Sequence, residues 1–245
     1  MEARDGGVAV ALGGVQQRSL LAVLLLNANE LVPTDRLVDE LWGEEPPKAA
    51  VKTVQVYVSR LRKQLGAEAL VTSPPGYLLR VAPERIDLHR FERLAGEGRQ
   101  ALAAGDAATA AKRLDEALSL WRGAPLSEFA YEPFAQAEAA RLEELRLATV
   151  EDRVEADLRC GRATELVGEL QGLAARHPLR ERLRGQLMLA LYRSRRQAEA
   201  LDVYRDTRTT LVEELGIEPS GGLQGSDRRR SRLARSWVVG RSLRR

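Results

Sequence analysis

Cysteine is almost absent from this chain. Cys160 is the only one among 245 residues, so no intrachain disulfide can form. Because a chain without disulfides suits a reducing compartment, we expect a cytoplasmic protein. Histidine is also scarce, and neither His89 nor His177 has a cysteine or a second histidine at the spacing of a metal site. We therefore predict that the protein uses no metal and no cofactor.

Aromatic residues and long apolar runs are also few. Aromatics make up 4% of the chain, whereas alanine, leucine, arginine and glutamate are abundant, which favours helices over a large β-sandwich. The longest wholly apolar run, Leu20–Leu26, is far too short to span a bilayer. The chain does not open with the pattern of an export signal. With 44% apolar and 30% charged residues, the composition is typical of globular proteins, and we expect no membrane association.

No constellation of catalytic residues is visible. His89 begins a predicted helix and His177 stands at a helix end, where histidine commonly caps the last carbonyls. Cys160 closes another helix, a position more typical of packing than of a nucleophile. Paired carboxylates such as Glu143 and Glu144 are typical of solvated helix faces. The sequence therefore predicts a protein that is not an enzyme.

The net charge of +3 is distributed unevenly. Residues 221–245 hold eight arginines and one acid, a net charge of +7, so the rest of the chain carries −4. Residues 1–90 contain 11 basic and 11 acidic side chains and are neutral as a whole. Bulk charge therefore does not indicate nucleic-acid binding, but local charge does. The segment Lys48–Leu65 contains five basic side chains and no acid.

The first 85 residues follow the pattern of three helices and a β-hairpin. A turn at Asp5-Gly6-Gly7 precedes a short predicted strand over 8–12. We expect helices over about 16–27, 33–42 and 48–65, and hairpin strands over 70–72 and 77–81. This order predicts a winged helix-turn-helix, in which the second helix props the third against a DNA groove. The hairpin, or wing, then reaches a neighbouring phosphate or the minor groove.

The third helix has two opposite faces on a helical wheel. Its predicted buried stripe consists of Val54, Val58, Leu61 and Leu65, with Tyr57 at the flank. The opposite face is cationic and carries small residues, which let a helix backbone approach base edges closely. That face comprises Lys52, Thr53, Val56, Ser59, Arg60 and Lys63, with Arg62 on one shoulder.

These side chains suit distinct roles on duplex DNA. Arg60 can bind a guanine bidentately, and Thr53 or Val56 can touch a thymine methyl group. Lys52, Arg62 and Lys63 are better placed for phosphates. On an isolated helix five basic residues would indicate only a solvated surface, but the preceding helix-turn and the following hairpin favour a recognition helix.

The hairpin turn Pro74-Pro75-Gly76-Tyr77 allows two interpretations. One is an ordinary tight turn without a function of its own. The other is a wing, in which the backbone N–H groups near Gly76, or the ring of Tyr77, meet the sugar-phosphate chain. We include Gly76 and Tyr77 among the predicted DNA-binding residues.

From Asp87 onward the pattern is helical throughout. The expected helices cover about 87–104, 106–122, 133–159, 163–176, 179–193 and 196–215. Residues 161–167 match residues 195–201 at an offset of 34, the period of tetratricopeptide helix pairs, and residues 105–111 resemble a further start of the same kind, out of register. We predict a short stack of helix pairs with a concave face for protein contact.

The predicted fold class is mainly α. An N-terminal winged helix-turn-helix (α+β) over residues 1–85 precedes an all-α, tetratricopeptide-like helical domain over residues 86–220. The arginine-rich tail, residues 221–245, shows no helical apolar periodicity, and we expect it to be disordered. Its charge would raise non-specific affinity for DNA without adding sequence specificity.

Several strings of residues resemble one bacterial family. Residues 56–63 (VYVSRLRK) and 74–79 (PPGYLL) resemble the OmpR-type winged helix of the SARP/AfsR antibiotic regulatory proteins. The second half resembles the bacterial transcriptional activation domain of that family. The matching strings are FERL at 91–94, ALSLWRG at 117–123, EPFA at 132–135, RLEELR at 141–146, HPLRERL at 177–183 and LVEELGIEP at 211–219. The resemblance runs from about Arg4 to Ser220.

The resemblance implies a transcriptional activator of secondary-metabolite (antibiotic) biosynthesis genes. Such a protein would act at the nucleoid, bind direct repeats near promoters and contact RNA polymerase, including its sigma factor. The resemblance also implies that Thr53, Val56, Arg60 and Arg62 face DNA. Ser73 departs from the family at a wing position that is often basic. No receiver domain and no phosphate-binding GxxxxGKS/T loop appears, so phosphorylation-driven or ATP-driven control has no basis in this sequence.

The sequence also bears on the oligomeric state and allows an alternative function. One recognition helix covers too few bases for specificity, so we predict a homodimer or tandem protomers on DNA. The alternative is a scaffold, in which the helical repeats bind a partner protein while the N-terminal module binds DNA weakly or non-specifically.

Overall fold

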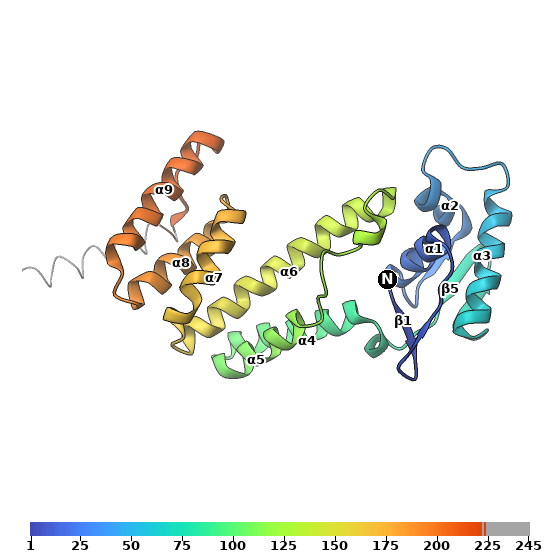
Figure 1. Cartoon of the computed structure of the whole chain (residues 1–245), viewed down its shortest axis with the longest axis horizontal. Coiled ribbons are helices and arrows are strands. Elements are labelled where there is room, and N and C mark those ends of the chain that lie inside the picture. The colour runs from blue at the N-terminus through green and yellow to red at the C-terminus, as the bar shows by residue number, and fades with distance from the viewer. Residues whose placement is uncertain (222, 224–245) are drawn as a thin grey trace, which may run out of the picture. The chain divides into compact units, whose positions relative to one another are not determined.

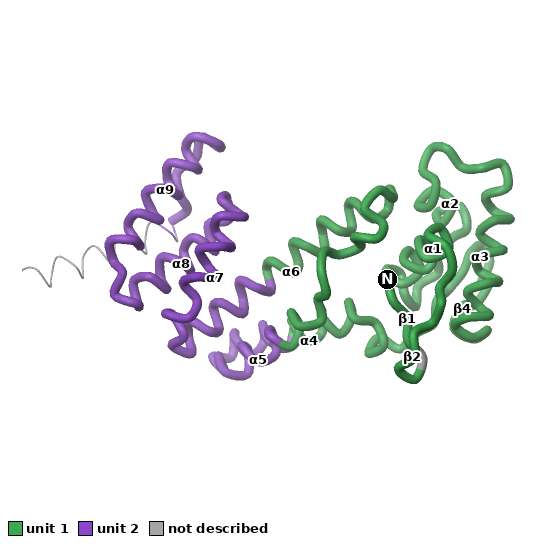
Figure 2. The backbone as a smooth tube through the Cα atoms, in the orientation of Figure 1, with its two compact units in different colours: residues 1–96, 116–148 green, residues 97–115, 149–245 purple. Residues whose placement is uncertain are grey.

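The computed structural model describes residues 1–221 and 223. It divides into two compact units (Figure 2). Unit 1 comprises residues 1–96 and 116–148, and unit 2 comprises residues 97–115 together with the described residues from 149 onward. The prediction of a disordered tail over 221–245 falls almost entirely outside the described residues.

Unit 1 begins with a small α+β module (Figure 1). The elements are β1 (Ala3–Asp5), β2 (Val8–Val10), α1 (Val15–Leu26), β3 (Leu31–Pro33), α2 (Thr34–Trp42), α3 (Ala50–Leu65), β4 (Leu70–Ser73) and β5 (Gly76–Leu79). Strands β1 and β2 form an antiparallel pair of their own. In the second sheet the order is β3-β5-β4 with antiparallel neighbours, so β5 is the central strand.

These elements confirm the predicted winged helix-turn-helix, with two additions. The three helices and the β4–β5 hairpin form where the sequence places them. Strands β1 and β3, each three residues long, were not predicted from the sequence. Strand β2 ends at Val10, two residues before the predicted end.

The helices of this module share one hydrophobic core. Helices α1, α2 and α3 pack against one another in pairs. Helix α1 is buried on most of its circumference, since Leu20, Leu21, Val23 and Leu24 are at most 2% exposed. This explains why its sequence is apolar almost all round rather than on one stripe. Leu37 and Leu41 of α2 enter the same core, as do Val32 of β3 and Leu70 of β4.

The remainder of the described chain is helical. Its elements are the 3₁₀ turn η1 (Pro83–Arg85), α4 (Asp87–Ala103), α5 (Ala107–Leu118), the 3₁₀ turn η2 (Ser127–Phe129), α6 (Pro133–Arg159), α7 (Ala163–Arg176), α8 (Glu181–Arg193) and α9 (Gln197–Leu215). The predicted helix bounds are confirmed to within a few residues, and the fold class, mainly α with a small N-terminal sheet, is also confirmed. In unit 2, α7 packs on α8 and α8 packs on α9.

The 34-residue repeat corresponds to a repeated helix-ending turn. Gly161 after α6 and Arg195 after α8 both have a positive φ, as does Gly105 after α4. In each case the next amide donates to a carbonyl five residues back: Asp106 to Ala101, Arg162 to Asp157 and Arg196 to Leu191. This is the hydrogen bond of the Schellman motif, which favours glycine at the left-handed position. The repeat in sequence thus reflects a repeat in how helices begin and end.

Partly buried ion pairs join α6 to the start of α8 in unit 2. Arg180 donates to Glu151 at 2.9 Å and Arg182 donates to Asp152 at 2.6 Å, and Glu151 is 3% exposed. Gln186 donates to the backbone carbonyl of Glu151 at 2.7 Å. A buried carboxylate is tolerated when it is paired and hydrogen-bonded in this way. The string HPLRERL at residues 177–183 therefore has a structural role, since its two arginines form ion pairs with acidic side chains of α6.

Among residues 1–221 and 223, no helix combines the length and apolar character needed to cross a bilayer.

Two glycines of α4 should respond oppositely to alanine. A Cβ at Gly98 would lie 2.5 Å from Cγ of Leu114, whereas a Cβ at Gly96 has no atom within 4 Å. We expect Gly98→Ala to lower the free energy of unfolding by roughly 1–3 kcal/mol through overpacking. We expect Gly96→Ala to raise it by about 0.5–1 kcal/mol, since alanine is the better helix former. Thermal and denaturant unfolding of both variants measures this, and a stabilising Gly98→Ala would contradict the packing described.

Candidate nucleic-acid interface

Helix α3 begins and ends at recognisable signals. Two prolines, Pro46 and Pro47, precede it, and the amide of Ala50 donates to the carbonyl of Pro47 at 2.8 Å. The helix starts at Ala50, two residues after the predicted start at Lys48. It ends before Gly66, whose φ of +95° is unfavourable for other residues. Arg62 and Lys63 in the last turn interact favourably with the helix dipole.

The buried side of α3 is the one that the wheel predicts. Val54, Val58 and Leu61 are at most 1% exposed and belong to the core of the module. Leu65 and Tyr57 are partly buried and pack against that core. The apolar stripe therefore fixes the rotation of the helix about its axis.

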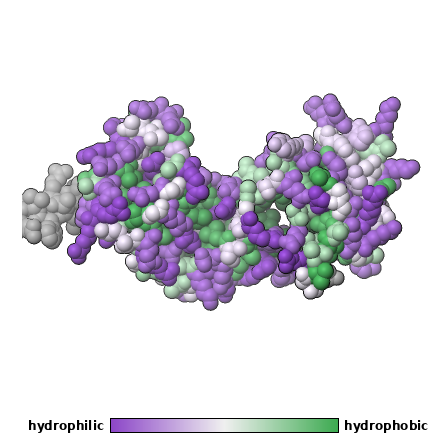
Figure 3. Space-filling view, in the orientation of Figure 1, coloured by the Kyte–Doolittle hydropathy of each residue, from purple (hydrophilic) through white to green (hydrophobic). Residues whose placement is uncertain are grey.

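The outward side of α3 brings most of the predicted residues together. Lys52, Val56, Ser59, Arg60 and Lys63 are all exposed, and Thr53 is half-buried. Figure 3 shows hydrophilic side chains gathered over this part of unit 1. Two further exposed residues on α3, Val51 and Gln55, were not in the predicted set. The same helical spacing could have identified them, since Gln55 lies three residues from Lys52 and four from Ser59.

Lys52, Arg60 and Lys63, the cations of this face, have no intramolecular ion-pair partner among residues 1–221 and 223. Exposed arginines elsewhere, such as Arg141 and Arg208, do pair. The hydroxyl of Thr53 donates to the carbonyl of Ala49 at 3.0 Å, so it is engaged within the helix. The face is therefore a cationic surface with small and apolar groups between the charges.

Arg62 has a different role from the other basic residues. Its Nε donates to the carbonyl of Leu70 at 2.7 Å, and its Nη2 donates to Oγ1 of Thr72 at 2.6 Å. Both acceptors lie on β4, so the half-buried Arg62 ties the recognition helix to the wing. At the same end of α3, Gln64 accepts a 2.9 Å hydrogen bond from the buried side chain of Gln17 on α1.

Two predicted wing residues, Gly76 and Tyr77, lie inside the fold. Tyr77 is 7% exposed and belongs to the hydrophobic core, and Gly76 is also buried. A Cβ at Gly76 would lie 1.9 Å from the carbonyl oxygen of Val32, which explains the glycine. The backbone of β5 is covered at both edges by β3 and β4, and the Tyr77 ring projects from the sheet into the hydrophobic core. Their burial argues against a sugar-phosphate contact by either residue.

The wing tip is held by the helix-turn-helix itself. The carbonyl of Pro75 accepts hydrogen bonds from the amide of Thr34 at 3.1 Å and from its hydroxyl at 3.0 Å. Thr34 is the first residue of α2, so the wing is fixed both to α2 and, through Arg62, to α3. The exposed groups at the tip are Pro74 and Pro75.

The described residues contain no candidate metal-binding cluster. No group of three or more histidine, cysteine, aspartate and glutamate side chains comes together among residues 1–221 and 223. Cys160 is a free, exposed cysteine.

Comparison with protein-family models gives two matches that together cover most of the chain. Residues 11–79 match the model described as "Transcriptional regulatory protein, C terminal". Residues 86–229 match the model described as "Bacterial transcriptional activator domain".

Individual relatives are regulatory proteins. The regulatory protein AfsR of Streptomyces coelicolor is 49% identical over 222 residues, which is 90% of this chain but 22% of AfsR. The regulatory protein DnrI of Streptomyces peucetius is 42% identical over 233 residues, 91% of this chain and 86% of DnrI. This chain thus spans about a fifth of the length of AfsR and most of the length of DnrI.

A solved structure with the same fold is that of Mycobacterium tuberculosis EmbR in complex with a low-affinity phosphopeptide. It superposes with a TM-score of 0.90 and is 38% identical in sequence. The match covers 93% of this chain and 62% of the EmbR chain.

Replacing Arg62 should destabilise the module more than replacing its neighbour. Arg62→Ala removes two hydrogen bonds between α3 and β4, and we expect a loss of about 1–3 kcal/mol in the free energy of unfolding. Lys63→Ala, on the exposed side of the same turn, should change it by less than about 0.5 kcal/mol. Denaturant unfolding of the two variants gives the comparison, and equal midpoints would rule out the tie between helix and wing.

Proposed function

The chain belongs to the family of bacterial transcriptional regulators that join a DNA-binding regulatory domain to a bacterial transcriptional activator domain, and from this premise we propose that it activates transcription by binding promoter DNA through the outward face of α3. The observation that carries the proposal is the cationic face of that helix, whose Lys52, Arg60 and Lys63 form no ion pair in the described part of the chain. The apolar side of α3 is buried in the core, so the cationic side is the one that can enter a DNA groove.

Individual roles follow from the chemistry of each side chain. Arg60 is proposed to bind guanine, and Val56 and the methyl group of Thr53 to contact thymine methyl groups. Ser59 and Gln55 supply short polar groups on the same face. Lys52 and Lys63 are assigned to phosphates.

Arg62 can serve the wing and DNA together. Its Nη1 makes no hydrogen bond within the described residues, so it is free to meet a phosphate while Nε and Nη2 hold β4. Gly76 and Tyr77 are left out of the proposed interface because they are buried.

The target and partners are proposed from the relatives. The kinship with AfsR and DnrI supports a regulator of secondary-metabolite genes that binds direct repeats near promoters and contacts RNA polymerase and its sigma factor. Such a protein works in the cytoplasm at the nucleoid. A single recognition helix reads few bases, so we propose a homodimer or tandem protomers on each operator. The family matches support sequence domains over 1–85 and 86–220.

Removing Arg60 tests the interface directly. We expect Arg60→Ala to weaken binding to a promoter fragment by about tenfold or more, because a good bidentate pair contributes roughly 1–3 kcal/mol of discrimination. Discrimination against a base-substituted operator should also fall, and the measurement is fluorescence anisotropy with both duplexes. Arg90→Ala, an exposed arginine of α4, is the matched control and should bind like the parent.

The scaffold alternative predicts the opposite dependence. Binding that survives Arg60→Ala, is indifferent to sequence and disappears when residues 221–245 are deleted would assign the affinity to the basic tail. The proposed role of α3 would then be wrong. Native mass spectrometry tests the stoichiometry, and saturation at one protomer per operator would contradict tandem or dimeric binding.

A further inference from the structure

A segment from the activator half of the sequence completes the core of the DNA-binding half. We call residues 126–141 the brace; it includes η2 and the first turns of α6. Although it lies within the region matched by the activator-domain model, it belongs to compact unit 1 (Figure 2). Phe129, Phe134 and Ala135 are 2%, 8% and 1% exposed and belong to the same hydrophobic cluster as α1, α2 and α3.

The brace faces the helices that support α3. Phe134, Glu138 and Arg141 share a cavity of about 250 Å³ with residues of α1 and α2, namely Val23, Leu26, Asn27, Arg36 and Glu40. Pro133 lies beside the end of α2, since its Cγ is 3.8 Å from the position of a Cβ at Gly43. The two phenylalanine rings contact each other at 5.7 Å between centroids.

An ion pair closes the other end of this contact. Glu128 of η2 accepts a hydrogen bond from Nε of Arg18 on α1, and Arg18 also donates to the backbone carbonyl of Gly13. The N-terminal ammonium group and, after it, the guanidinium of Arg18 hold the pKa of the Glu128 carboxyl below its ordinary value. The charge of Glu128 is thus matched to a cation on the DNA-binding module.

Packing of the buried brace residues against α1 and α2 therefore affects the position of α3. Helices α1 and α2 each contact α3, and both lie against the brace. Tightly packed interiors transmit displacements, because side chains in them have few alternative arrangements. A ring removed from the brace would leave α1 and α2 unsupported on one side, and α3 rests on these two helices.

We propose that Phe129 and Phe134 are positioning residues for DNA binding, because the brace and the helix-turn-helix form one cooperative structure. DNA bound on α3 then stabilises residues 126–141. Conversely, loss of the brace weakens DNA binding. This inference rests on the proposed function, since it requires that α3 binds DNA. Linkage makes the coupling reciprocal, so a partner that binds the start of α6 in the braced conformation would strengthen DNA binding.

Hydrogen exchange of the full-length protein with and without a promoter duplex tests the coupling. At a DNA concentration of 100 times Kd, a structure that binds DNA only when folded is stabilised enough to slow exchange through its unfolding about 100-fold. We expect this slowing for the buried amides of α1 and equally for those of residues 133–141. If α1 is protected while residues 133–141 exchange as before, the brace is not part of the cooperative structure and the inference is overturned.

The same experiment separates this inference from the proposed function. Absence of protection in α1, α3 and the brace alike would mean that the protein does not bind the duplex, and both proposals would fall. Protection of α1 and α3 alone would leave the proposed function standing and remove only the brace.

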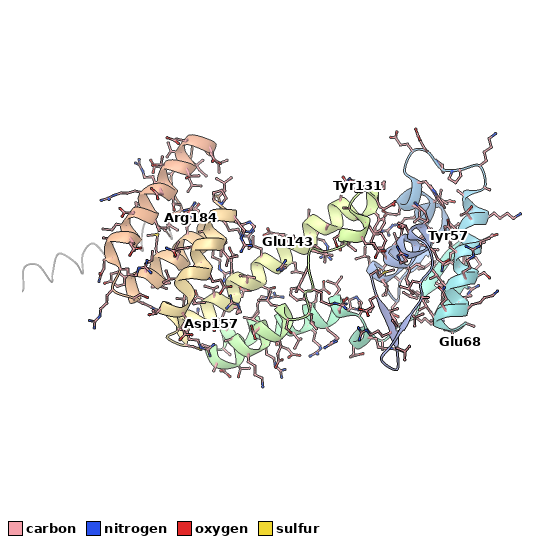
Figure 4. The ribbon with its side chains drawn as sticks, in the orientation of Figure 1. Tyr57, Glu68, Tyr131, Glu143, Asp157 and Arg184 are labelled. Atoms are coloured by element: carbon pink, nitrogen blue, oxygen red, sulfur yellow. The ribbon has the colours of Figure 1, made fainter. Side chains whose placement is uncertain are left out.

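Variants of the brace supply an independent measurement. Phe134→Ala should raise the Kd for promoter DNA about tenfold, and Phe134→Leu, which refills most of the volume, should restore most of the affinity. Tyr131→Ala is the matched control, because Tyr131 is an aromatic residue of the same segment but is 98% exposed (Figure 4). It should leave Kd unchanged.

The salt dependence distinguishes a positioning residue from a DNA contact. Loss of a phosphate contact reduces the slope of log K against log salt by about one, whereas loss of positioning lowers K with little change of slope. We expect Phe134→Ala to keep the parent slope. An unchanged Kd for Phe134→Ala in a folded protein, or equal effects of Phe134→Ala and Tyr131→Ala, would overturn the inference.

Discussion

Burial of one side of α3 is the constraint on which the rest of the molecule depends. Val54, Val58 and Leu61 are almost completely withdrawn from water, and each contributes roughly 1.5–3 kcal/mol when fully buried. No rotation of the helix about its axis can keep these side chains buried and also turn Arg60 inward. Hydrophobic burial, which has no direction of its own, therefore decides which charges face outward.

Directional contacts then fix α3 relative to its surroundings. Arg62 joins it to β4, Gln64 joins it to Gln17 of α1, and Thr34 joins the wing tip to α2. The first two are hydrogen bonds made by side chains in the last turn of α3. The Arg62 contact fixes α3 relative to the wing, and the Gln64 contact fixes it relative to α1. Apolar packing sets the face and polar contacts set the orientation.

In this chain the boundary of the sequence domain differs from the boundary of the compact unit that shares one hydrophobic core. A family model begins at residue 86, and the helical pattern starts at about the same place. Yet the core of the DNA-binding module includes Phe129 and Phe134, from beyond α5. Arg18 and Glu128 pair across 110 positions of sequence. A boundary drawn from periodicity marks where the secondary structure changes, whereas cooperativity follows buried contacts, and the two need not coincide.

Sequence by itself determined the helices, the two faces of α3 and the repeated turns, because side-chain periodicity and turn residues are local properties. It identified Lys52, Val56, Ser59, Arg60 and Lys63 as outward residues for that reason. Only the tertiary structure decided that Tyr77 is buried, that Arg62 is held by β4 and that Phe129 completes a distant core. Each of these depends on a neighbour from another segment, such as the strand that covers the second edge of β5, and no local pattern encodes which segment that neighbour comes from.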